Sequence, residues 1–221
     1  MLFIFVALVL VSMEDKPSLY PEKLSAFGFF KNEMKMQLPE DGVVPYALAT
    51  PLFSDYAEKL RFVRVPKGSF ALFNDSTVFD FPIGTALIKT FYFPIDFRNP
   101  NKGRRLMETR VLLHENKGWV ALPYIWNADQ TDAILSVAGE TLQASYIDGK
   151  GKKKSYEYLV PNVNQCKGCH NRSEQMMPIG PSARQLNHEI QLGENRSNQL
   201  EFWTANHMLE GIQDIKKLHT S

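Results

Sequence analysis

The feature that most constrains the fold is a run of short strand-like segments from about residue 59 to residue 160. Turn residues interrupt this run at intervals of about eight to twelve positions, as in Pro66-Lys67-Gly68 and Asn116-Lys117-Gly118. Spacing of this kind is typical of a β-sandwich or barrel. The expected strands are 60–65, 69–73, 77–81, 86–93, 106–114, 119–126, 133–137 and 156–160, and the stretch 106–126 is the clearest hairpin.

A second feature lies directly after this run. Cys166-Lys167-Gly168-Cys169-His170 is a C-x-x-C-H motif, and it uses the only two cysteines of the chain. In this motif the two thiols form thioethers with the vinyl groups of haem, and the histidine binds the iron from one side. The two intervening residues place both sulfurs on one edge of a helical turn. The sequence therefore predicts one covalent haem c held by Cys166 and Cys169, with His170 as an axial iron ligand.

Three other interpretations of the same residues are weaker. A disulfide between Cys166 and Cys169 would close a very small loop and contribute little stability. A thioredoxin-like redox pair needs a β-α-β context that the flanking sequence lacks. A structural zinc site usually needs four Cys or His ligands, and the chain has no second cysteine pair.

The chain after Pro161 has helical rather than strand character, with expected helices at 164–170, 182–190 and 198–208. The sequence thus predicts an α+β protein in which a β-sandwich-like N-terminal domain precedes a small α-helical, cytochrome c-type haem segment. The expected divisions are an apolar leader and linker at 1–20, the β-rich domain at 21–160 and the haem segment at 161–221. The boundary is expected near Val160.

The leader indicates export. Met1 to Ser12 is one apolar run, which is shorter than the roughly 20 residues of a membrane span and resembles the core of a signal peptide. Because haem is normally attached to C-x-x-C-H outside the cytoplasm, a periplasmic or otherwise exported protein is expected. Contact with a membrane is expected only through an uncleaved leader.

The second axial ligand of the iron is the open chemical question. Met208 is the preferred candidate, because the chain between it and His170 is long enough to reach the far face of a haem. Met177 and His188 are the alternatives, although Met177 follows His170 too closely to cross the haem easily. Arg184 is a candidate partner for a haem propionate, since arginine binds carboxylates in two-pronged geometry. An ion pair within the protein is the other interpretation of Arg184.

Charge and the remaining polar residues add little to this picture. Lys and Arg number 25 against 24 Asp and Glu, a balance that gives no support to nucleic-acid binding. Glu108 and Arg110 share one side of an expected strand and are expected to pair. The polar residues 129–132 form either a turn held by side-chain hydrogen bonds or a ligand-binding loop. No constellation typical of catalysis is evident.

A set of runs spread over roughly residues 25 to 211 carries a family resemblance; the runs are 45–46, 50–57, 79–93, 108–110, 126–133, 160–170, 178–187 and 198–200. They resemble a family of bacterial exported c-type cytochromes that are often described as dihaem and are sometimes encoded beside a parallel β-helix protein. Similar modules occur fused to quinoprotein sugar-dehydrogenase-like domains. The resemblance implies a family more firmly than a mechanism, and the expected partner is a redox protein such as a quinoprotein dehydrogenase.

The chain departs from that family in one respect, because it has no second C-x-x-C-H motif. A monohaem protein is therefore expected. Electron transfer is the favoured function, since no distal acid–base pair accompanies the motif. The alternatives are a haem-dependent enzyme or small-ligand sensor with an open iron site, and a β module that binds a partner or glycan and uses haem structurally.

Overall fold

The computed structural model describes residues 19–172 and 174–218. Residues 1–18 of the expected leader lie outside this range. Strands dominate the described part of the chain, so the prediction of a β-rich protein is confirmed. The elements are η1 (Leu24–Phe27), β1 (Phe30–Lys31), η2 (Met34–Met36), β2 (Leu38–Pro39), β3 (Val43–Pro45), β4 (Glu58–Arg64), β5 (Ala71–Leu72), β6 (Ala86–Pro94), η3 (Pro100–Lys102), β7 (Arg104–Glu115), β8 (Gly118–Trp126), β9 (Ala133–Leu135), β10 (Glu140–Ile147), β11 (Lys153–Val160), α1 (Val163–His170), β12 (Asn171–Arg172), β13 (Gln175–Met176), α2 (Ala183–Leu186), β14 (Glu189–Leu192), β15 (Asn195–Asn198), α3 (Gln199–Ala205), β16 (Leu209–Glu210) and η4 (Ile215–Lys217).

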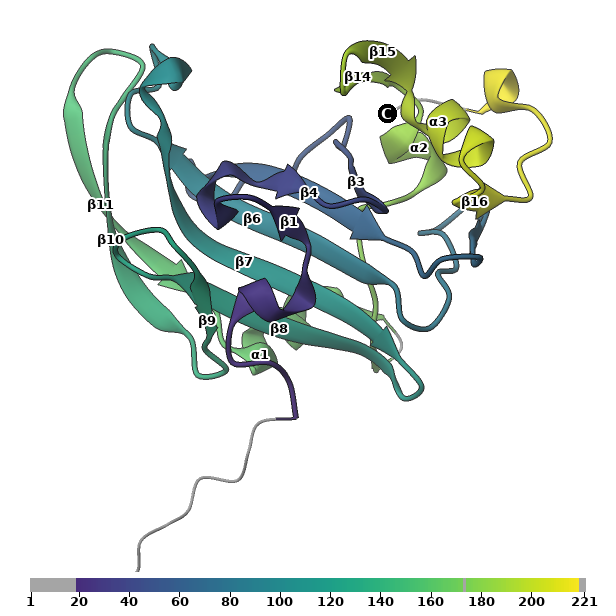
Figure 1. Ribbon diagram of the computed structural model, residues 1–221, viewed down its shortest axis with the longest axis horizontal. Coiled ribbons are helices and arrows are strands. Elements are labelled where there is room, and N and C mark those ends of the chain that lie inside the picture. Colours follow the sequence, from purple (N-terminus) through teal and green to yellow (C-terminus); the bar gives the residue numbers. More distant parts are fainter. Residues whose placement is uncertain (1–18, 173, 219–221) are drawn as a thin grey trace, which may run out of the picture.

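The central layer is a six-stranded antiparallel sheet with the strand order β3-β4-β6-β7-β8-β9 (Figure 1). Its longest strands, β7 and β8, form the hairpin that the sequence predicted. Glu115 pairs with Gly118, so only two residues make the turn, and Gly118 has the positive φ of 106° that favours glycine. Of the eight expected strands, only 77–81 forms no strand, and it makes isolated bridges at Val78 and Asp80.

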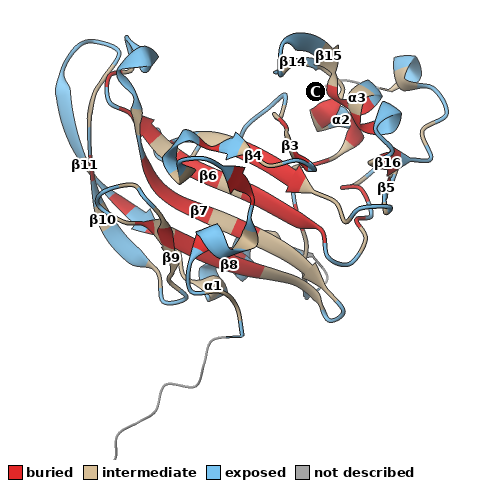
Figure 2. Ribbon diagram, viewed as in Figure 1, coloured by how far each residue is buried: buried red, intermediate tan, exposed pale blue. Residues whose placement is uncertain are grey.

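Side chains alternate between the two faces of this sheet. On the first face, Ile88 and Val111 pack against Phe29 and Leu24 from the N-terminal segment, and all four are fully buried. Figure 1 shows this segment crossing the front of the sheet. Figure 2 shows buried residues along the central strands beneath it.

The second face carries two separate apolar clusters. Near one end, Phe91 and Phe93 pack against Ala144 and Tyr158 of the β10–β11 hairpin, which we call the hairpin wall. Near the other end, Leu87 belongs to a cluster that includes residues of α2, α3, β5 and β16, which we call the C-terminal wall. The walls lie at opposite ends of the view in Figure 1.

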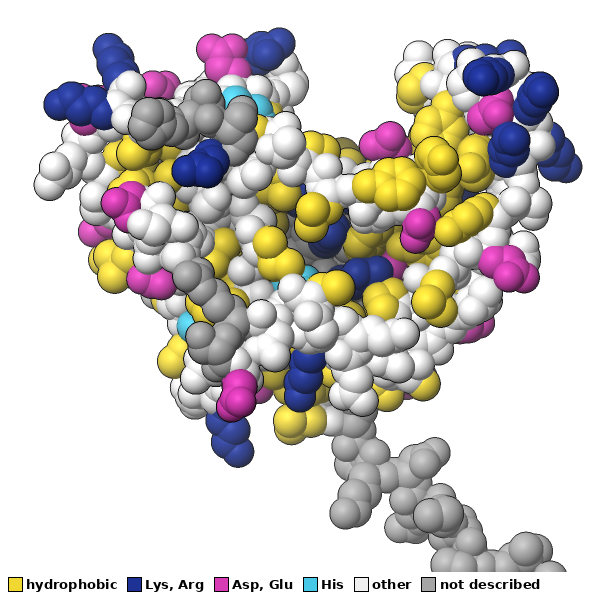
Figure 3. Space-filling model, turned by 180° about the vertical axis from the view of Figure 1, so that it is seen from behind, with side chains coloured by type: hydrophobic (Ala, Val, Ile, Leu, Met, Phe, Trp, Pro, Cys, Tyr) yellow, Lys and Arg dark blue, Asp and Glu magenta, His cyan; other side chains and the backbone are white. Residues whose placement is uncertain are grey.

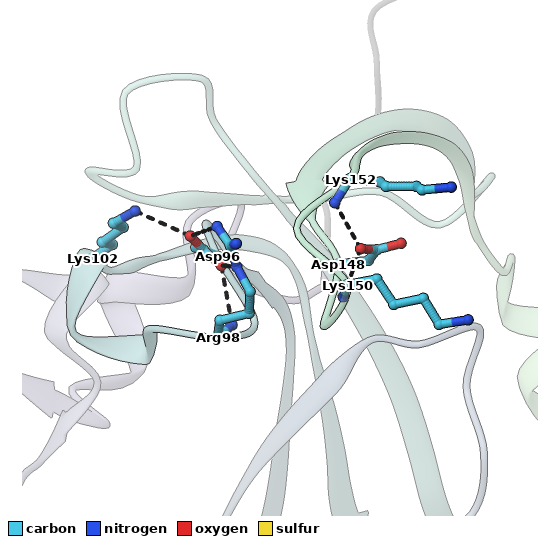
Figure 4. A network of polar contacts seen from close by, with 6 residues as sticks. All are labelled: Asp96, Arg98, Lys102, Asp148, Lys150 and Lys152. Carbon is cyan, nitrogen blue, oxygen red and sulfur yellow. Dashed lines mark hydrogen bonds and ion pairs between the residues drawn. The ribbon is translucent and has the colours of Figure 1, made fainter.

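A buried carboxylate fixes the hairpin wall to the loop between β6 and β7 (Figure 4). Asp96 is 1% exposed and accepts hydrogen bonds from Arg98 Nε and Nη2 and from Lys102 Nζ, each at 3.0 Å. Its backbone also bridges Ile147 of the hairpin. Hydrogen bonds from Arg98 hold the pKa of Asp96 well below its usual range. At the hairpin tip, Asp148 accepts two backbone N–H groups of its own turn at 2.9 Å.

The part after Pro161 is less helical than expected. Its three helices are short, and the helix expected at 182–190 ends at Leu186, after which β14 and β15 form a hairpin around Gly193 with φ of 62°. The helix expected at 198–208 is α3, which begins after Asn198. The side chain of Asn198 caps it by accepting the Leu200 N–H at 2.9 Å.

The boundary expected near Val160 falls between β11 and α1, and apolar packing crosses it. Leu200 and Trp203 of α3 are fully buried in one cluster with Val63 and Leu87 of the sheet. Strand β16 also pairs in parallel with β5. The C-terminal part therefore shares a core with the sheet.

Candidate haem-attachment site

Helix α1 carries the C-x-x-C-H motif and begins with a capping box. The side chain of Asn162 accepts the Gln165 N–H, and the Gln165 side chain accepts the Asn162 N–H, both at 2.9 Å. The helix places Cys166, Cys169 and His170 within its last five residues. Both cysteines are free thiols, Cys166 buried and Cys169 exposed. Burial raises the pKa of the Cys166 thiol.

The ring of His170 is held in one orientation. Its Nδ1 lies 2.9 Å from the carbonyl oxygen of Met177, and because a carbonyl can only accept, Nδ1 carries the proton. Met177 N–H donates in return to the His170 carbonyl at 2.7 Å. The other nitrogen, Nε2, therefore keeps its lone pair, which is the arrangement of a metal-binding imidazole. Burial lowers the pKa of His170, which favours the neutral ring.

A buried polar triad lies in the sheet beside Cys166. Glu108 is fully buried and accepts hydrogen bonds from Arg110 Nε at 2.7 Å, Arg110 Nη2 at 2.6 Å and the hydroxyl of Tyr158. The predicted pairing of Glu108 with Arg110 is confirmed. Burial and the Glu108 carboxylate together raise the pKa of Tyr158. The triad joins β7 to the hairpin wall next to the motif.

Three cationic side chains form a row across the second face of the sheet. Arg61 of β4 is directly opposite Lys89 of β6, and Lys89 is directly opposite Arg110 of β7. Residues directly opposite in neighbouring strands point to the same face. The charges of Lys89 and Arg110 act on His170, so the row lies close to the motif. The sequence did not reveal this row, because its strands become neighbours only in the folded sheet.

The face opposite to that of Figure 1 is hollowed at its centre, between two raised lobes (Figure 3). Lys or Arg side chains and a His side chain are visible inside this depression, among apolar ones. A cavity of about 750 Å³ lies beside the β7–β8 hairpin. It is lined by Trp119, Lys167 and Met177, among others, but not by Cys166, Cys169 or His170.

The candidate distal ligands lie in different surroundings. Met177 is bonded to His170 through its backbone, on the Nδ1 side of the ring. Met208 is half-buried and packs on the apolar cluster of the C-terminal wall, where its carbonyl accepts the Ala71 N–H at 2.8 Å. His188 lies against Gln199, whose Nε2 is 3.3 and 3.4 Å from the two ring nitrogens.

Other predicted residues are placed more simply. Arg184 is exposed on α2 and makes no ion pair within the described part of the chain. The polar loop is a turn held by its side chains, because Asn127 Oδ1 accepts the Thr131 and Asp132 N–H groups at 3.0 and 3.2 Å. Gln130 connects this turn to β7, because its Oε1 accepts the Leu106 N–H and its Nε2 donates to the Leu106 carbonyl.

Two features are absent from residues 19–172 and 174–218. No group of three or more His, Cys, Asp or Glu side chains could hold a metal ion there, and no helix there is long and apolar enough to cross a membrane. Comparison of the chain with protein-family models, with curated proteins and with solved structures gives no match.

Proposed function

We propose that this protein is an exported monohaem c-type cytochrome that carries electrons. The observation that carries the proposal is the arrangement on α1, where two free thiols accompany an imidazole whose Nδ1–H is already donated to Met177. An iron ligand requires a free ring nitrogen, and Nε2 of His170 meets that requirement. The C-x-x-C-H spacing supplies both thioether positions and the ligand within five residues.

The residues of the site suit attachment of this cofactor. Cys166 and Cys169 would hold the haem through two thioether bonds; each would form by adding the S–H group across one vinyl double bond, with sulfur on one carbon and hydrogen on the other, so that no oxidant would be consumed. His170 supplies its Nε2 to the iron, and Met177 keeps the ring from rotating. Haem supplies one-electron chemistry at its iron.

Electron transfer further requires a second axial ligand that prevents other molecules from binding the iron. Met208 is our candidate, since sulfur ligation raises the potential and favours a low-spin iron. The partner is proposed to be a redox protein in the periplasm, such as a quinoprotein dehydrogenase. The haem-dependent enzyme or sensor is the competing function, and it requires an open iron.

One spectroscopic experiment separates these two functions. The haem-loaded protein is reduced, and its absorption spectrum is recorded with and without carbon monoxide. We expect no change on adding carbon monoxide to the wild type, and rapid binding in Met208→Ala. Met176→Ala, which also removes a half-buried methionine, is the matched control and should behave as the wild type. Binding of carbon monoxide by the wild type would favour the enzyme or sensor.

A further inference from the structure

The row of Arg61, Lys89 and Arg110 on the second face of the sheet has more positive charge than the neighbouring carboxylates neutralise. Like charges directly opposite each other on a sheet are destabilising, and here Lys89 lies between Arg61 and Arg110. The adjacent carboxylate, Glu108, is already occupied by Arg110 and Tyr158. Within the part of the chain that the structure describes, Arg61 and Lys89 make no ion pair with a carboxylate.

Burial makes this imbalance more costly. Arg61 is only 9% exposed, and its side chain donates no hydrogen bond to a described residue. Lys89 is half-buried, and its Nζ lies 4.6 Å from the centre of the Phe91 ring. Burial lowers the pKa of Lys89 to about 7, and the charges of Arg61, Arg110 and Lys59 contribute to this shift. Charges in such positions are normally paired, so the row is suited to an anion from outside the described chain.

The position of the row indicates which anion this is. The row lies on the face of the sheet that is hollowed in Figure 3, between the apolar clusters of the two walls. Helix α1 contacts β8, and the row leads from β7 to β4, away from the helix. In a c-type haem the thioether edge and the edge with two carboxylates are opposite each other. A haem attached at α1 and lying across the second face of the sheet would bring its two carboxylates toward the row.

We propose that Arg61 and Lys89 form a carboxylate-binding site, and that its occupants are the propionates of the attached haem. This inference rests on the proposed function. It replaces Arg184 as the propionate partner, because Arg184 is exposed on α2, whereas the charge of Lys89 acts on His170 and Arg61 is directly opposite Lys89. Arg61 offers two-pronged hydrogen bonding to one carboxylate, and Lys89 offers a point charge.

The first test compares one substitution with and without haem. Lys89→Met keeps the length of the side chain and removes its charge, and Lys153→Met, at an exposed lysine of β11, is the matched control. Thermal unfolding is measured for haem-loaded protein and for haem-free full-length protein carrying Cys166→Ala and Cys169→Ala. We expect Lys89→Met to raise the midpoint without haem, by relieving repulsion, and to lower it with haem. Lys153→Met should change both only slightly.

A change of the same sign in both states would overturn the proposal. A lower midpoint in both would make Lys89 a purely structural residue, and a higher midpoint in both would mean that no anion lies on the row. The three apolar clusters consist of protein side chains packed against one another, without a contribution from haem. The haem-free chain is therefore expected to fold. If it does not, the haem-loaded proteins alone decide: Lys89→Met should lower the unfolding midpoint more than Lys153→Met does, and equal midpoints of the two variants would overturn the proposal.

The second test identifies the source of the carboxylate, with succinate as the probe. Succinate should raise the midpoint of haem-free protein, and Lys89→Met should abolish that rise. Succinate should leave the unfolding midpoint of haem-loaded wild type unchanged, because the propionates already occupy the row. If succinate raises the unfolding midpoint of haem-loaded wild type and Lys89→Met abolishes that rise, the row binds a free carboxylate. That result would overturn the assignment of the propionates as its occupants. Failure to attach haem would overturn the proposed function, while the succinate arm would still report on Arg61 and Lys89.

Discussion

The imidazole of His170 donates its Nδ1–H to the carbonyl oxygen of Met177 at 2.9 Å, seven residues later in the chain. The return bond from Met177 N–H to the His170 carbonyl closes a small loop after α1. The tautomer of the ring is fixed by the backbone carbonyl of Met177 and not by the Met177 side chain. The orientation of the candidate iron ligand is thus a property of the backbone.

Met177→Ala should therefore leave the site intact. The substitution keeps the carbonyl that accepts from His170 and removes only a half-buried side chain. The absorption spectrum and potential of haem-loaded protein should be unchanged, and the loss of stability should be about 1 kcal/mol. Loss of a methionine–iron band near the red end of the ferric spectrum would instead make Met177 the distal ligand.

Glu108→Gln should be strongly destabilising. It leaves the guanidinium of Arg110 without its carboxylate in a site where Glu108 is fully buried, and breaking such a pair costs about 3 kcal/mol. Chemical denaturation with urea measures the difference. Glu189→Gln removes an exposed ion pair with Arg196 and should cost at most about 1 kcal/mol. Equal effects of the two substitutions would contradict the account of the triad.

The stability of haem-free protein should rise with pH above about 7 because of Lys89. Its pKa is lowered to about 7 by burial and by Arg61, Arg110 and Lys59, against the opposing charge of Glu108. Between that pKa and the ordinary value near 10.4, the unfolded chain binds the proton and the folded chain does not, so raising the pH favours folding.

Urea unfolding at pH 7, 8 and 9 measures this slope, which for one group is at most about 1.4 kcal/mol per pH unit. Lys89→Met should reduce it, and the exposed control Lys153→Met should not. A slope that is unchanged in Lys89→Met would show that another group causes it.

Trp203→Ala should destabilise the whole protein rather than the C-terminal part alone. The side chain is fully buried between α3 and the sheet, in contact with the rings of Tyr46, Phe79 and Phe81. Removing it should cost about 3–5 kcal/mol and preserve a single unfolding transition by circular dichroism and tryptophan fluorescence. Two separated transitions would mean that the part after Pro161 folds independently.

Local patterns predicted the parts of the structure that depend on nearby residues. Alternation and the turn residues Asn116-Lys117-Gly118 predicted the β7–β8 hairpin, and spacing along one strand predicted the Glu108–Arg110 pair. The capping residue Asn198 and the turn around Asn127 likewise depend on contacts within a few positions.

The relationships that the sequence did not predict depend on which strands become neighbours. Alternation shows that Arg61, Lys89 and Arg110 each point to one side of a strand, but only the register of β4, β6 and β7 aligns them. The hydroxyl of Tyr158 reaches Glu108 from 50 residues away. The helix expected at 182–190 ends at Leu186, because Glu189–Leu192 pair instead with β15 across a turn in which Gly193 has a positive φ.

Covalent attachment of haem is the central claim, and acid–acetone extraction tests it most directly. The full-length protein is produced in an exporting host with haem-attachment machinery, beside a Cys166→Ala/Cys169→Ala variant. We predict that one haem per chain stays with the extracted wild-type protein and that none stays with the variant. Wild-type protein that loses its haem to the solvent, or a variant that retains it, would contradict the account.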